Sequence, residues 1–196
     1  MYTTGFFIKR RQVSHCLITF LLALPLWGGG TDVLRAKSGI VTSRSMIASE
    51  VGISIMKRGG NAVDAAVATA FALAVTYPSA GNIGGGGFML IRLADGTIAV
   101  NDHREEAPQK ATRDMYLGAD GEPVRELSRS THLAVGVPGS VAGLLDALEK
   151  YGNLPREAVL EPAIRLAREG FRLPDDIALQ IKGRLADLSR FPAGRD

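Results

Sequence analysis

Cysteine and histidine are scarce, which excludes several classes of chemistry. The only cysteine among the 196 residues is Cys16, in the stretch 1–30 that we expect to be removed. The mature chain would then have no disulfide, no thiol nucleophile and no cysteine metal ligand. Beyond that stretch the histidines are His103 and His132, and no His-Glu-x-x-His spacing occurs. We therefore predict no metal site.

The chain also lacks a strong charge of either sign once its N-terminus is set aside. The formal net charge of +3 comes with Lys9, Arg10 and Arg11, and the stretch 1–30 holds no acidic residue. Removal of this stretch leaves a net charge of zero. A nucleic-acid partner is therefore unsupported.

A long hydrophobic run is missing as well. The apolar run Cys16–Trp27 follows the three basic residues and precedes three glycines, 28–30. A bilayer-spanning helix needs roughly 20 apolar residues, so this run is too short for a stable membrane span. The pattern predicts a secretory signal peptide over 1–30, a mature start near Thr31 and export to the bacterial periplasm. The alternative is an uncleaved membrane anchor.

Two further motifs are absent. No Gly-x-Ser-x-Gly sequence indicates a serine hydrolase. The glycine-rich stretch Gly81–Gly87 does not fit a phosphate-binding loop, because such loops run from a strand into a helix. Here a helical pattern precedes the glycines and a strand pattern follows. Close backbone packing or a tight approach to a substrate is the better interpretation.

What is present is a mixed pattern of helices and one hairpin, with 46% hydrophobic residues, enough for a core. Residues 31–196 are expected to be an incomplete domain, since only one hairpin is available for so many helices. The turn signal Asp95-Gly96 joins the two strands. The sequence predicts helices over 46–57, 62–75, 138–151, 155–169 and 174–190, strands over 88–93 and 97–101, and an irregular surface segment over 105–136.

Two helix starts have clear capping residues. Ser45 can cap the first helix, and Asn61 can cap the second. Asp64 stands at the third position of the second helix, where its carboxylate can accept free backbone N–H groups. That helix is apolar on nearly all sides and should be largely buried.

Arg104 is the candidate binding residue. Ile98 and Val100 share one face of the second strand, and side chains two apart point the same way, so Asp102 and Arg104 should continue an inward face. A cation there needs an anion, either a substrate carboxylate held by the guanidinium fork or a neighbouring side chain. The candidate protein partners are Asp102, Glu105 and Glu106.

Four segments together resemble the γ-glutamyltranspeptidase family, with the likeness running from about Ser38 to about Leu188. They are Gly60–Ala68, Gly81–Leu90, Asp102–Pro108 and Pro138–Gly143. The resemblance implies an α+β fold, the N-terminal-nucleophile hydrolase αββα sandwich, of which only the N-terminal portion would be present. It also implies no cofactor.

The resemblance implies a reaction as well. In that family a threonine freed at the start of the small subunit attacks the γ-glutamyl amide of glutathione or a related compound. Arg104 matches the large-subunit residue that pairs with the α-carboxylate of the γ-glutamyl group. The last threonine here is Thr131, inside the region similar to the large subunit. We therefore expect no catalytic residue in this chain and no activity without the missing small subunit.

Two alternatives remain. The chain could be part of a related acylase, similar to the cephalosporin acylases, since the large-subunit motifs indicate fold more than substrate. It could also be a non-catalytic secreted remnant that retains the carboxylate pocket. An open reading frame downstream that encodes a small subunit beginning with threonine would favour the enzyme.

Overall fold

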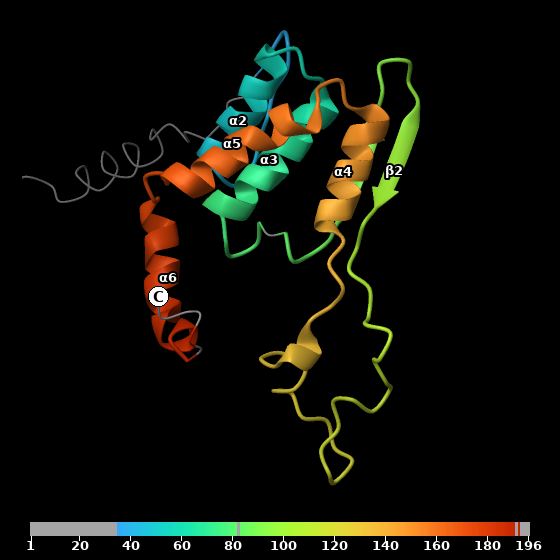
Figure 1. Cartoon of the computed structure of the whole chain (residues 1–196), viewed down its shortest axis with the longest axis vertical. Helices are drawn as coiled ribbons and strands as arrows, with labels where there is room; N and C mark the ends of the chain where they lie inside the picture. Colours follow the sequence, from blue (N-terminus) through green and yellow to red (C-terminus); the bar gives the residue numbers. More distant parts are fainter. Residues whose placement is uncertain (1–34, 82, 191, 193–196) are drawn as a thin grey trace, which may run out of the picture. The chain divides into compact units, whose positions relative to one another are not determined.

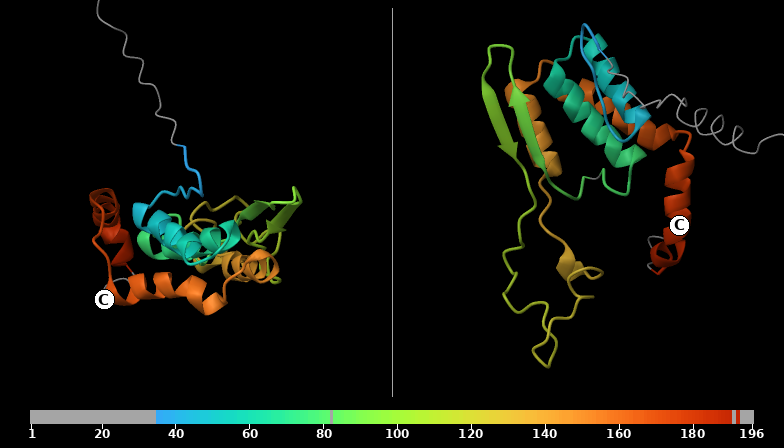
Figure 2. Two further views of the ribbon diagram at one scale, coloured as in Figure 1. Left: turned by 90° about the horizontal axis from the view of Figure 1, so that it is seen from above. Right: turned by 180° about the vertical axis from the view of Figure 1, so that it is seen from behind.

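The computed structural model describes residues 35–81, 83–190 and 192. The predicted signal peptide therefore lies outside the described residues. The chain divides into two compact units, Met1–Lys37 and Ser38–Asp196. All described helices and strands belong to the second unit, which Figures 1 and 2 show from three sides.

Helices α2 (Met46–Lys57) and α3 (Ala62–Thr76) form as their capping residues predict. The hydroxyl of Ser45 accepts the N–H of Ala48 at 3.3 Å. At the start of α3 the Asn61 side chain accepts two backbone N–H groups, and Asp64 accepts the N–H of Asn61 at 2.7 Å. Each bond satisfies a backbone donor that the first turn would otherwise leave free.

Helix α3 lies at the centre of the core. It packs along α2 on one side and contacts α4 and α5 on others (Figure 1). Ala62 and Ala66 are its only exposed residues, which confirms the prediction of a largely buried helix. The fully buried core positions shared by these helices are Ala48, Ile55, Val67, Ala68, Ala72, Ala147 and Val159.

The hairpin consists of β1 (Phe88–Arg92) and β2 (Ile98–Asp102), paired antiparallel. Its turn is the predicted one, with Gly96 at φ +90°, a conformation that suits glycine. The carboxylate of Asp95 accepts the N–H of Thr97 at 2.8 Å. Hydrogen bonds from the backbone and the side chain of Thr97 lower the pKa of Asp95.

The face of the hairpin that we expected to point inward is exposed. Ile98 is 66% exposed and Val100 67%. The covered face carries the alternate residues, with Ile91 buried and Met89 and Ala99 packed against the core. The prediction was wrong because both faces of this hairpin are apolar, so parity alone could not decide which face the helices of this chain cover.

Three helices follow: α4 (Ser140–Tyr151), α5 (Arg156–Glu169) and α6 (Asp175–Leu188). All three were predicted, and α5 ends at Gly170, whose φ is +78°. On α4, Leu144 and Leu148 are buried as expected, whereas Val141, in the first turn, is 40% exposed. Figure 2 shows α4 lying against the hairpin.

Residues 105–136 form the expected irregular segment, whose one helical turn is η1 (His132–Ala134). The segment leaves β2 and returns to α4, and a bridge between Glu106 and Val137 closes its base. None of the helices in the described part of the chain has the length and apolar character to cross a membrane. The predicted α+β class is confirmed.

Candidate functional site

A cavity of about 380 Å³ lies where β2 ends, between the hairpin and the first half of α4. From the hairpin side it is lined by Asn101, Asp102, His103 and Arg104. From α4 and the residues before it come Pro138, Gly139, Gly143 and Asp146. With Glu106 also in its lining, the cavity collects one guanidinium, one imidazole and three carboxylates from segments about 40 residues apart in sequence.

Glycines enclose the backbone that carries this site. A Cβ on Gly86 would lie 2.5 Å from the His103 carbonyl oxygen and 2.6 Å from the Glu105 nitrogen. A Cβ on Gly139 would overlap the same His103 carbonyl group, and one on Gly143 would overlap the His103 side chain. The glycine-rich stretch therefore serves close backbone packing, as its sequence context indicated.

Hydrogen bonds fix the same segment. Gly87 and His103 exchange backbone bonds of 3.2 and 3.0 Å, which continue the hairpin ladder. The N–H groups of Gly139 and Ser140 both donate to the Gly85 carbonyl at 2.9 Å. The glycine-rich stretch, the end of β2 and the start of α4 are consequently tied to one another.

Arg104 lies on the surface of this cavity with its side chain exposed. Its backbone N–H donates to the carboxylate of Asp102 at 3.1 Å. Among the described residues its guanidinium forms no ion pair with Asp102, Glu105 or Glu106. Within the described part of the chain, the structural pairing that we weighed from the sequence therefore does not form.

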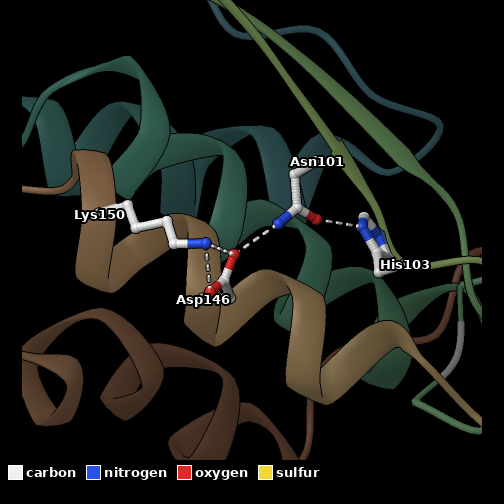
Figure 3. Close-up of polar contacts among 4 residues, drawn as sticks. All are labelled: Asn101, His103, Asp146 and Lys150. Atoms are coloured by element: carbon white, nitrogen blue, oxygen red, sulfur yellow. Dashed lines mark hydrogen bonds and ion pairs between the residues drawn. The ribbon is translucent and has the colours of Figure 1, made fainter.

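Beside Arg104, four side chains form a continuous polar chain (Figure 3). Lys150 contacts Asp146 at 2.8 Å, Asn101 donates to Asp146 at 2.8 Å, and the Nδ1 atom of His103 lies 2.7 Å from the amide oxygen of Asn101. The hydrogen bond to Asp146 and its negative charge raise the pKa of Lys150. Of these four residues, only His103 was considered from the sequence, where it was set aside as a metal ligand.

Asp64 holds the far end of α4. Its fully buried carboxylate accepts the N–H of Asn153 at 3.0 Å and that of Leu154 at 3.1 Å, besides the Asn61 N–H of its own helix. The amide of Asn61 donates to the Tyr151 carbonyl at 2.6 Å. The cap of α3 therefore also anchors the loop that follows α4.

No metal-binding cluster exists among the residues that the structure describes.

Comparison with known proteins gives the family. The family model described as Gamma-glutamyltranspeptidase matches residues 48–196. The glutathione hydrolase proenzyme of Escherichia coli K12 is 54% identical over 149 residues, which are 76% of this chain and 26% of that protein. The corresponding proenzyme of Pseudomonas sp. A14 is 54% identical over 85% of this chain and 29% of its own length.

Solved structures agree with these matches. The γ-glutamyltranspeptidase of Helicobacter pylori has a TM-score of 0.79 at 43% identity, covering 83% of this chain and 46% of that one. The cephalosporin acylase of Bacillus halodurans has a TM-score of 0.65 at 28% identity, covering 82% and 30%. The predicted N-terminal-nucleophile hydrolase fold, present in part, is thereby confirmed.

The chain spans about a quarter of the length of the curated relatives it matches. The family model nevertheless covers most of the chain, including Arg104 and the glycines around it. The chain belongs to the γ-glutamyltranspeptidase family.

Proposed function

We propose that this chain supplies the carboxylate-binding part of a γ-glutamyltranspeptidase. Joined to a small subunit that carries the threonine nucleophile, it would cleave the γ-glutamyl amide of glutathione or a related compound. The acyl group would pass to water or to an amino-acid or peptide acceptor. In this reaction Arg104 holds the α-carboxylate of the γ-glutamyl group.

The observation that supports the proposal is the environment of the Arg104 side chain. Its guanidinium lies at a cavity and is free of ion pairs with the described residues, while glycines and hydrogen bonds fix its backbone. A planar fork held in place and left unpaired suits bidentate binding of a carboxylate.

Glutathione is favoured over a cephalosporin as the substrate class. The matched relatives named glutathione hydrolase are 54% identical to this chain, whereas the matched cephalosporin acylase is 28% identical. The remnant hypothesis shares the pocket with the enzyme and differs only in lacking a small subunit. Turnover after completion with a small subunit separates the two.

By itself the chain should be inactive. Its last threonine, Thr131, lies in the irregular segment, where its hydroxyl donates to the Leu127 carbonyl at 2.7 Å. As an internal residue it has no free α-amino group to serve as a base. Pure chain should show no γ-glutamyl transfer and no self-cleavage, and measurable turnover would overturn this assignment.

The decisive test of Arg104 uses a precursor in which residues 38–196 are completed with the C-terminal part of a glutathione hydrolase relative. Two substrates are compared, a γ-glutamyl anilide and the γ-aminobutyryl anilide that lacks the α-carboxylate. Loss of one partner of a desolvated pair costs about 2–5 kcal/mol, about 30- to 4,000-fold in kcat/KM. Arg104→Ala should lose that factor for the first substrate only.

Arg104→Lys should recover part of the loss, because an ammonium keeps the charge without the planar fork. Arg92→Ala is the matched control, since it removes an exposed arginine from the same hairpin away from the cavity. Self-cleavage should persist in all three variants. A variant Arg104→Ala that matures normally and still prefers the α-carboxylate would refute the binding role.

Export forms a second part of the proposal. The basic residues, apolar run and glycines of 1–30 support a cleaved signal peptide and a periplasmic location. N-terminal sequencing of protein exported by a bacterium should give a start near Thr31. Recovery only in the membrane, starting at Met1, would support the anchor instead.

A further inference from the structure

The polar chain beside the cavity has a direction that its chemistry fixes. The ammonium of Lys150 can only donate, and the paired carboxylate of Asp146 accepts. Asn101 must therefore turn its NH₂ group toward Asp146 and its oxygen toward His103, as the 2.8 and 2.7 Å contacts require. The Nδ1 atom of His103 consequently carries a proton, and in the neutral ring Nε2 is the acceptor.

The imidazole is also fixed by packing. A Cβ on Gly143 of α4 would overlap the His103 side chain, and one on Gly87 would lie 3.3 Å from its Nε2 atom. The ring thus occupies the space that these two glycines leave open. His103 directly precedes Arg104, so a ring held in place by Asn101, Gly87 and Gly143 also holds the backbone of Arg104.

We propose that Asn101 and Asp146 are positioning residues for Arg104. Asp146 orients the amide of Asn101, Asn101 holds the His103 ring, and that ring fixes the point from which Arg104 extends. The proposal rests on the proposed function, because it assumes that Arg104 binds the α-carboxylate. Nothing about Asn101 or Asp146 requires contact with substrate.

These side-chain contacts add to the backbone bonds between Gly87 and His103, which already continue the hairpin ladder. The outer face of the hairpin is exposed, and β2 ends at Asp102, two residues before Arg104. Asn101 lies on the covered face, where it links β2 to the middle of α4. Bidentate binding depends on position, and a displacement of about 1 Å can cost about 100-fold in rate.

The test uses the completed precursor and the same pair of anilides, with the preference for the α-carboxylate as the readout. Asn101→Asp places a second carboxylate against that of Asp146 and should disrupt the polar chain of side chains. The preference for the α-carboxylate should then fall by about tenfold or more. Asn101→Ala should lower it by about tenfold. Glu149→Gln removes a negative charge from the exposed side of α4 and should leave the preference unchanged.

A reciprocal exchange makes the test specific. In Asn101→Asp combined with Asp146→Asn, the new amide at 146 can donate to the new carboxylate at 101 and still accept from Lys150. That carboxylate can accept from His103 as before, so every donor keeps an acceptor. The preference should return to within about threefold of the wild type. A double variant no better than Asn101→Asp alone would overturn the proposal.

A final pair of variants separates this proposal from the function on which it rests. In an Arg104→Ala background, Asn101→Ala should cause no further loss of preference, because a positioning residue acts only through its target. If Arg104→Ala abolishes the preference and Asn101→Ala leaves it intact in the wild type, the positioning role is wrong and the function stands. If Arg104→Ala itself preserves the preference, the proposed function fails first.

Discussion

Replacement of Asp64 by alanine should destabilise the protein more than most single substitutions, because this carboxylate joins two parts of the fold. Its side chain is fully buried and accepts backbone N–H groups from Asn61, Asn153 and Leu154. A hydrogen bond to a charged group contributes about 1.5–3 kcal/mol, and the three bonds share one carboxylate and are not additive. We expect a loss of about 3–5 kcal/mol in the free energy of unfolding.

Hydrogen exchange measured by mass spectrometry on the completed precursor reports this loss where it occurs. In Asp64→Ala the amides of Asn153 and Leu154 should exchange about 100-fold faster or more, since about 1.4 kcal/mol corresponds to a factor of ten. Asn61→Ala is the control, because it removes the cap of α3 and the bond to Tyr151 but leaves Asp64 in place. Asn61→Ala should lower the free energy of unfolding by about 1–2 kcal/mol.

The reasoning fails if Asp64→Ala leaves both the exchange of these two amides and the unfolding free energy within about 0.5 kcal/mol of the wild type. That result would mean that water replaces the carboxylate at no cost. Asp64→Asn gives a further check, because it keeps the volume but offers one acceptor oxygen and places an NH₂ group among donors. The free energy of unfolding of Asp64→Asn should fall between those of the wild type and Asp64→Ala.

Two further predictions concern glycines and the uncovered hairpin face. Gly139→Ala should prevent folding or maturation because the new Cβ overlaps the His103 carbonyl. Gly183→Ala, in open space within α6, should leave the free energy of unfolding unchanged or raise it by about 0.5–1 kcal/mol. The yield and the thermal melting of the two variants test this difference. The isolated chain should aggregate, and Leu90→Lys with Val100→Glu, a directly opposed cross-strand pair, should reduce light scattering while leaving circular dichroism unchanged.

Local signals explain how much of the fold could be predicted. Ser45, Asn61 and Gly170 mark helix ends through capping or a positive φ, and Asp95-Gly96 specifies its turn from neighbouring residues alone. Each of these depends on backbone groups within four residues, so the helices and strands fall within two residues of their expected bounds. Tertiary contacts of the same residues were not predictable, as the bonds from Asn153 and Leu154 to Asp64 show.

The candidate site divides in the same way. Arg104 was predicted from strand parity and from the resemblance of its segment. Asn101 and Asp146 lie 45 residues apart in sequence and come into contact only because β2 packs against α4. An asparagine on a strand and an aspartate on an amphipathic helix are ordinary surface residues in a sequence. The available signal was that Asn101 is a polar residue next to the apolar Val100, in a strand whose preceding residues are apolar on both faces.

That two-sided apolar character is also why the direction of Arg104 was mistaken, and the error is informative. Strand parity correctly placed Ile98, Val100 and Asp102 on one face, and the register confirms it, with Leu90 opposite Val100 and Phe88 opposite Asp102. The helices of this chain cover the opposite face, so the expected inward face is open to solvent. A strand that is apolar on both faces indicates a sheet covered on both sides. Arg104 is therefore exposed at the border of an apolar surface that a second layer of structure would cover. Only with that layer in place would the guanidinium become desolvated and its pair with a carboxylate become stronger.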